Sequence, residues 1–173
     1  DGIRQALDLQ GGEDRATLFQ QYLDDCVTSE QRKAALNTLA GHLREEAFPI
    51  LAREIERDLV EDKYGQLGTA VGALRNVPGQ ECTEFLLRLF DDDRTRRFAR
   101  HALSAPIREG AKSVYLANLQ DNHPENTYFR STVEAVLQYH WPEAIPLLQQ
   151  IMATPYVPSH YTLAAEAVRA LEG

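Results

Sequence analysis

The stretch FLLRLFDDDRTRRFARHAL, residues 85–103, decides the fold. Its first six residues are almost all apolar, the run Asp91–Asp93 interrupts them, and Ala99, Ala102 and Leu103 follow at positions i, i+3 and i+4. Residues at this spacing share one face of an α-helix. Two small alanines let a neighbouring helix approach closely, and the leucine fills the gap beside them. The stretch therefore predicts two helices joined by an acidic turn.

The same small-x-x-small-branched pattern occurs five times, at intervals of 29 to 35 residues, and an amphipathic segment precedes each copy. Repetition at this period is typical of stacked helical hairpins, because one repeat cannot bury its apolar face alone. No segment shows the period-two alternation of a strand. The sequence thus predicts an all-α protein, an α-solenoid of about five antiparallel hairpins, each with a helix A and a helix B. The copies begin at Ala35, Ala70, Ala99, Thr132 and Ala164.

We expect residues 1–173 to form a single domain, because helix boundaries recur where the repeat places them. Thr28 or Ser29 can cap the first B helix, and Asp91–Asp93 can cap the third. Pro124 and Pro142 suit first helical turns, where a missing N–H costs nothing. The predicted repeats cover roughly residues 14–43, 44–77, 80–105, 107–140 and 142–172.

Composition limits the class of protein. The chain has 173 residues, 43% of them hydrophobic and 25% charged, which argues against disorder. No apolar run approaches the roughly 18 residues of a membrane span, and the first residues do not resemble a signal peptide. The absence of an initiator Met leads us to expect a trimmed chain or a piece of a longer protein. The net charge of −8 argues against a general nucleic-acid or membrane-surface binder. Cys26 and Cys82 are too few for a disulfide scaffold and favour a reducing, cytoplasmic compartment.

Residues 85–103 resemble the HEAT-repeat families, whose pattern is an LLxxL helix, an Asp at the turn, an Arg and then AxxAL. Arg32 and Arg96 lie three residues before the first small residue, where those families often carry Arg; the other copies have Leu67, Phe129 and Tyr161 there. Pro49 and Pro146, expected inside A helices, also resemble the proline that bends helix A in HEAT repeats. The resemblance covers roughly residues 14–172 and implies a HEAT-like fold. It transfers no site, since such arrays include scaffolds, transport receptors, bilin lyases and DNA-repair glycosylases.

Residues that would carry chemistry are scattered. The phosphate-binding, dinucleotide-binding, zinc-protease, CxxC and GxSxG motifs are all missing from the sequence. His140 and Glu143 have the spacing of a metal pair, but Trp141 and Pro142 break the helix between them. Asp91–Asp93 reads better as a helix-capping turn than as a metal or catalytic cluster. We therefore predict no catalytic residue, metal or cofactor, although triads defined by geometry cannot be read from a sequence.

The sequence predicts one candidate binding loop, at 153–159 between the last two helices. It carries two prolines and the aromatic Tyr156, and His160 and Tyr161 follow it. The alternative, which we favour, is that these aromatic side chains close the core of the last repeat, because terminal repeats are usually atypical.

The face of the B helices that points away from the core is the main candidate site. Helical phasing from the core positions predicts five Lys or Arg against two Glu on this strip, although the whole chain is acidic. A chance imbalance among seven charges is the alternative explanation. The partner-binding residues predicted on the strip are Lys33, Arg75, Arg97, His101, Arg130, Glu134, Gln138 and Arg169, with Glu166 as the second carboxylate. The same phasing places Ala40, Gly41, Ser104, Ala105, Leu137 and Ala170 there as its small or apolar members.

These observations predict that the chain is a non-enzymatic protein-interaction module that binds an acidic segment of a partner protein. It would act as a scaffold, or as an inhibitor or immunity-type partner. The second hypothesis is a nucleic-acid-binding protein resembling the HEAT-like DNA-repair glycosylases, with the basic strip as its site. It is less favoured because the single Trp, Trp141, lies at a helix junction and supplies no platform for a base. A HEAT-like bilin lyase is a third resemblance, and no residue specifically supports it.

Overall fold

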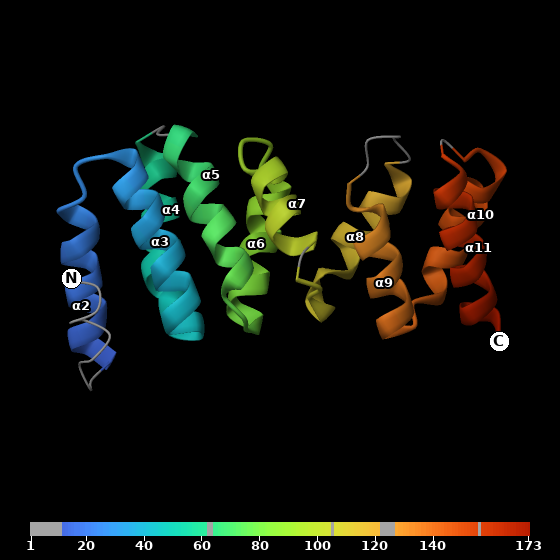
Figure 1. The fold of residues 1–173 in the computed structure, drawn as a ribbon, viewed down its shortest axis with the longest axis horizontal. Coiled ribbons are helices and arrows are strands. Elements are labelled where there is room, and N and C mark those ends of the chain that lie inside the picture. Colours follow the sequence, from blue (N-terminus) through green and yellow to red (C-terminus); the bar gives the residue numbers. More distant parts are fainter. Residues whose placement is uncertain (1–11, 62–63, 105, 122–126, 156) are drawn as a thin grey trace. The chain divides into compact units, whose positions relative to one another are not determined.

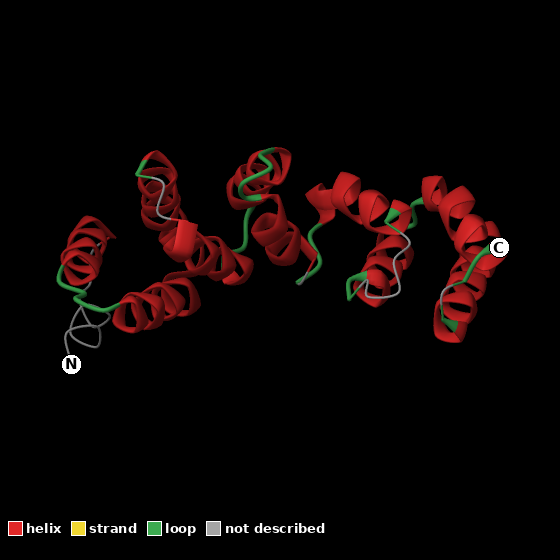
Figure 2. Cartoon of the chain, turned by 90° about the horizontal axis from the view of Figure 1, so that it is seen from above, coloured by secondary structure: helices red, strands yellow, loops and turns green. Residues whose placement is uncertain are grey.

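The computed structural model describes residues 12–61, 64–104, 106–121, 127–155 and 157–173, with the side chains of 12–16 and 64–66 outside the description. These residues form helices joined by short loops and contain no strand (Figure 2), which confirms the all-α prediction. The chain divides into two compact units, Asp1–Ala102 and Leu103–Gly173. Whether the repeat continues across this boundary stays a prediction.

The first unit contains three helical pairs, found from blue to yellow-green in Figure 1. Helix α3 contacts α2 and α5, and α4 contacts α5. The rings of Phe48 on α4 and Phe85 on α6 meet edge to face at 5.7 Å. The helices are α2 (Gly12–Asp24), α3 (Ser29–Leu43), α4 (Phe48–Val60), α5 (Tyr64–Ala73), α6 (Gln80–Asp91) and α7 (Arg96–Ser104), with 3-10 turns η1 (Arg44–Ala47) and η2 (Leu74–Asn76).

The second unit contains two helical pairs. Helix α8 contacts α9 and α10, and α11 contacts α9 and α10. The first helix of one pair therefore packs on the first helix of the next pair, and the second helix packs on the second. The helices are α8 (Lys112–Gln120), α9 (Phe129–Tyr139), α10 (Ile145–Ala153) and α11 (Pro158–Glu172), with 3-10 turns η3 (Glu109–Ala111) and η4 (Pro142–Ala144).

The repeated small residues lie in the core, as their spacing predicts. Ala70, Ala73, Ala99, Ala102 and Ala167 are each fully buried. Large apolar side chains are also fully buried in both units, among them those of Leu36, Leu67, Leu86, Tyr115 and Leu148. The pattern that identified the B helices is therefore the pattern that lets them pack.

Local chemistry fixes several helix ends. The Thr28 hydroxyl accepts a hydrogen bond from the backbone N–H of Gln31, and the Gln31 side chain accepts one from the N–H of Thr28. This reciprocal capping box confirms the predicted start of α3. Gly79 precedes α6 with φ +102°, a conformation that glycine adopts without strain.

The prediction that Pro49 and Pro146 lie inside A helices is wrong. Both occupy the first turn of their helices, α4 and α10, directly after the 3-10 turns η1 and η4. At that position the N–H has no intrahelical partner, so proline neither removes a hydrogen bond nor bends the helix. Pro142 lies in the first turn of η4, close to its predicted place, whereas Pro124 lies outside the described residues.

Candidate functional site

The B helices of the first unit and the turn after α5 carry four of the predicted binding residues, and all four are exposed. Lys33 lies on α3, Arg75 on η2, and Arg97 and His101 on α7. The guanidinium carbon of Arg97 lies 5.6 Å from the centre of the Phe98 ring, which helps to hold it on this face. Three of these residues are permanent cations, and no predicted strip residue in this unit is a carboxylate.

The second unit carries the other four, Arg130, Glu134 and Gln138 on α9 and Arg169 on α11, and these are exposed too. Arg130 Nε lies 3.3 Å from Glu134 Oε1, one helical turn away, so the two charges neutralise each other locally. The charge of Glu166 cancels that of Arg169 in the net charge of the strip. The excess of positive charge that the sequence predicted for the strip therefore lies wholly in the first unit.

The predicted phase of the strip is wrong at two positions. Ala40 is fully buried, because the core stripe of α3 runs through Leu36, Leu39, Ala40 and Leu43 rather than through His42. Ser104 is also fully buried, and its hydroxyl accepts a hydrogen bond from Asn118 Nδ2 at 3.2 Å. Gly41, Leu137 and Ala170 are exposed as expected, and Ala105 lies outside the described residues.

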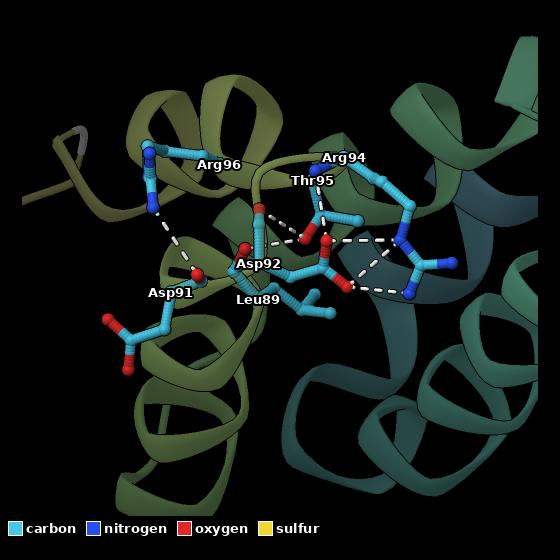
Figure 3. A network of polar contacts seen from close by, with 6 residues as sticks. All are labelled: Leu89, Asp91, Asp92, Arg94, Thr95 and Arg96. Atoms are coloured by element: carbon cyan, nitrogen blue, oxygen red, sulfur yellow. Dashed lines mark hydrogen bonds and ion pairs between the residues drawn. The ribbon is translucent and has the colours of Figure 1, made fainter.

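The acidic turn between α6 and α7 holds a network of hydrogen bonds and ion pairs (Figure 3). Asp92 Oδ1 accepts a hydrogen bond from the backbone N–H of Arg94 at 2.9 Å within the turn, and the expected capping of α7 by this run stays a prediction. The Arg94 guanidinium binds both carboxylate oxygens of Asp92, and these hydrogen bonds lower the pKa of Asp92 to about 2. The Thr95 hydroxyl donates to the buried carbonyl of Leu89 and ties the turn to α6.

Arg96 is also engaged within this turn. Its guanidinium lies 2.6 Å from Asp93 and donates to the carbonyls of Phe90 and Asp91. Arg94 and Arg96 are thus held by α6 and its turn, whereas the exposed Arg97 of α7 belongs to the predicted strip. Among the residues that the structure describes, no group of three or more His, Cys, Asp or Glu side chains could hold a metal ion.

A buried charge network joins α2, α3 and α4, and the sequence analysis missed it. Glu54, only 1% exposed, forms ion pairs with Arg32 on α3 and with Arg57 Nη2 at 2.8 Å on its own helix. It also accepts a hydrogen bond from Gln20 on α2, and Arg57 lies 3.8 Å from Asp24. Burial lowers the pKa of the Arg32 guanidinium, and the neighbouring Arg57 adds to this effect.

The signal for this network was the position of Glu54, three residues after Leu51 on the apolar face of α4. Perturbed, buried charges are frequent in active sites but also hold structural networks together. Each cation here is matched by a carboxylate from a neighbouring helix, and the network fixes the packing of three helices. We therefore assign it to stability rather than to chemistry.

An aromatic cluster surrounds Trp141 at the junction between α9 and α10. The Trp141 ring stacks on Tyr139 at 5.3 Å and lies 5.8 Å from Tyr115, whose hydroxyl donates to the carbonyl of Leu103 at 2.8 Å. Burial raises the pKa of Tyr115. Lys112 reaches over the indole to form a 2.7 Å ion pair with Glu143. Because Trp141 is only 8% exposed, it cannot serve as a stacking platform for a nucleobase in this arrangement.

The candidate loop is shorter than predicted, because helix α10 ends at Ala153 and α11 begins at Pro158. Tyr156 lies outside the described residues. His160 and Tyr161 belong to the first turns of α11. The His160 ring packs on Phe129 at 4.1 Å, as expected of an aromatic group that closes the repeat core, but Tyr161 is 47% exposed.

Comparison with known proteins identifies no relative: no family model matches the chain, and neither a curated protein nor a solved structure is significantly similar to it. Within the described part of the chain, every helix is too short or too polar to cross a membrane. Cys26 and Cys82 are both free thiols, half-buried and buried respectively.

Proposed function

We propose that the chain is a non-enzymatic, HEAT-like helical-repeat module that binds an acidic segment of a partner protein. The site is the basic face of the first unit, which we define as Lys33, Arg75, Arg97 and His101. A single observation carries the proposal: three of these four exposed side chains are Lys or Arg, and no predicted strip residue of this unit is a carboxylate, on a chain whose net charge is −8.

Contacts within each unit support the stacked arrangement that the repeat predicts. The B helices α3 and α5 contact each other, and so do α9 and α11. Gly68 on α5 lies so close to the Phe98 ring of α7 that an added Cβ would come within 2.7 Å of it. Small residues at such crossings allow helices to pack closely, and neighbour-on-neighbour packing is the defining feature of a solenoid.

The charge distribution supports an acidic partner rather than a neutral one. Cations on one face of an acidic body attract a negatively charged segment and orient it as it approaches. The Asp92–Arg94 and Asp93–Arg96 pairs neutralise the two arginines at the nearby turn, so these pairs add little net charge beside the basic face. Both cysteines are free thiols, which suits a reducing compartment such as the cytoplasm.

Charge reversal tests the site. We compare the Lys33→Glu/Arg97→Glu double variant with an Arg53→Glu/Arg88→Glu control on the exposed surfaces of α4 and α6. Arg57 is unsuitable as a control because it pairs with Glu54. The probe is a fluorescently labelled poly-glutamate peptide, followed by anisotropy at low and at physiological salt.

Binding should weaken as salt rises, because exposed charge contacts are screened over about 8 Å at physiological ionic strength. The Lys33/Arg97 variant should lose about tenfold or more in affinity, and the control should lose much less. Equal losses in the two variants would refute this site. Duplex DNA and RNA belong in the same titration, because tighter binding to either than to the peptide would replace this proposal with the nucleic-acid hypothesis.

A further inference from the structure

Helix α5 is the middle B helix of the first unit and carries two glycines at positions that belong to the basic face on its neighbours. It contacts α3, and Gly68 lies against the Phe98 ring of α7. Counted from the first buried alanine of each repeat, Gly68 has the same place as Lys33 on α3 and Arg97 on α7. Gly72 follows one turn later. The middle of the face therefore has no side chain where both flanking helices carry a cation.

Packing accounts for Gly68 but not for Gly72. A Cβ on Gly68 would come within 2.7 Å of the Phe98 ring, so the approach of α7 requires glycine there. Among the described residues beyond its own helix, nothing lies within 4 Å of a Cβ built on Gly72. Gly72 also lacks the positive φ with which a glycine ends a helix.

The fold thus carries a glycine that weakens α5 without a structural need, since glycine inside a helix is less stable than alanine. Gly41 on α3 is a second such glycine, because its Cβ would also meet open space, and it too belongs to the predicted strip. Departures from local preference that packing does not explain are expected at functional sites. The missing side chains therefore bear on what lies against this face.

The spacing of the helices sets the length of a segment that reaches both flanking cations. Packed helices have axes about 8–10 Å apart, so α3 and α7, with α5 between them, are about 16–20 Å apart. An extended chain covers about 3.3 Å per residue, so about five or six residues span this distance. Helix α5, YGQLGTAVGA, carries no charged residue, and Arg75 follows it on η2. A segment that joins Lys33 to Arg97 thus meets cations at its two ends and bare helix in between.

We propose that the basic face takes an extended segment laid across α3, α5 and α7, with acidic side chains at two ends about six residues apart and small uncharged residues over Gly72. This inference rests on the proposed function and adds the pattern of the partner to its charge. Small residues allow the main chain of the segment to lie close to α5, where no Cβ holds it away. An acidic side chain in the middle would find no charged partner on α5.

Two peptides of the same composition separate this inference from the proposed function. In the spaced peptide, two pairs of glutamates flank Ser-Gly-Ser-Gly, and in the clustered isomer the four glutamates are adjacent. Fluorescence anisotropy with the full chain at low salt should show that the spaced peptide binds about fivefold or more tightly than the clustered one. Equal binding, or tighter binding of the clustered isomer, would overturn the inference and leave the proposed function standing. If Lys33→Glu/Arg97→Glu weakens neither peptide, the proposed function fails and the inference fails with it.

A substitution in the middle of the face provides the second measurement. Gly72→Leu should weaken binding of the spaced peptide by about fivefold or more, because the new side chain occupies the path of the segment. Gly41→Leu is the matched control: it also adds a side chain in open space on a helix, but two turns after Lys33, about 12 Å along α3. Thermal melts check that both variants are folded. Equal losses in the two variants, or a Gly72→Leu variant that binds as the unmodified chain does, would also overturn the inference.

Discussion

Replacing Glu54 by glutamine tests whether the buried charge network holds the first unit together. Glutamine keeps the shape of the side chain but removes its charge. Arg32 is then left 13% exposed without its principal carboxylate, while its pKa is already lowered by burial and by Arg57. A cation in that position is costly, because removing one partner of a buried pair leaves the other uncompensated.

The magnitude follows from the burial of each pair. The Arg32–Glu54 pair is almost fully enclosed, and breaking such a pair costs about 3–5 kcal/mol. The lower end applies, because Asp58 and Asp24 partly compensate the charge of Arg32. Arg57 is 36% exposed, so its pair with Glu54 contributes at most about 1 kcal/mol. We expect Glu54→Gln to lower the free energy of unfolding by about 3 kcal/mol and Arg57→Ala to lower it by about 1 kcal/mol or less.

Urea unfolding followed by far-ultraviolet circular dichroism measures these differences. The matched control is Glu56→Gln, an exposed carboxylate on the same helix, which should stay within about 0.5 kcal/mol of the unmodified chain. An Arg32→Met/Glu54→Leu double variant should recover much of the loss, because apolar groups of similar volume can replace a buried ion pair. A Glu54→Gln variant as stable as the Glu56→Gln control would refute the role given to the network.

Three further changes probe packing and pH. Gly72→Ala should stabilise the chain by about 0.5–1 kcal/mol, because an added Cβ there meets open space. Gly68→Ala should give no such gain, because its Cβ would collide with the Phe98 ring. Thermal melts compare the two variants, and equal stabilisation would contradict the Gly68–Phe98 contact. Ala102→Leu should cost about 1–3 kcal/mol by overpacking, and an unchanged melting midpoint would contradict its burial. Burial lowers the pKa of His160, so the neutral ring favours the folded state; stability should fall as pH drops below about 6.5, and His160→Gln should flatten that decline in urea titrations.

The helices could be predicted because their signals are local. Small residues at i and i+3, the Thr28 cap and the acidic turn before Arg96 each act within one or two helical turns, and the structure contains all three. The two prolines were misplaced because a proline in the first turn and one in the middle of a helix look alike until the helix start is known. Their 3-10 turns, η1 and η4, supply that start.

The buried charges could not be predicted because they depend on contacts between helices. Glu54 interrupts an apolar face, and the cost of burying its carboxylate is offset only by Arg32 from α3 and Gln20 from α2. Ala40 shows the same limit on a smaller scale. Phasing α3 from Ala35 alone rotates the core stripe by about one residue, and the neighbouring helices decide which phase is used.

The basic face could be predicted from the sequence only in part. A cluster of cations can be counted, so the strip was predicted. Its concentration in the first unit depends on the Arg130–Glu134 ion pair and on where the compact units divide. Both are properties of the folded chain, which is why counting charges along the B helices predicted one strip over both units.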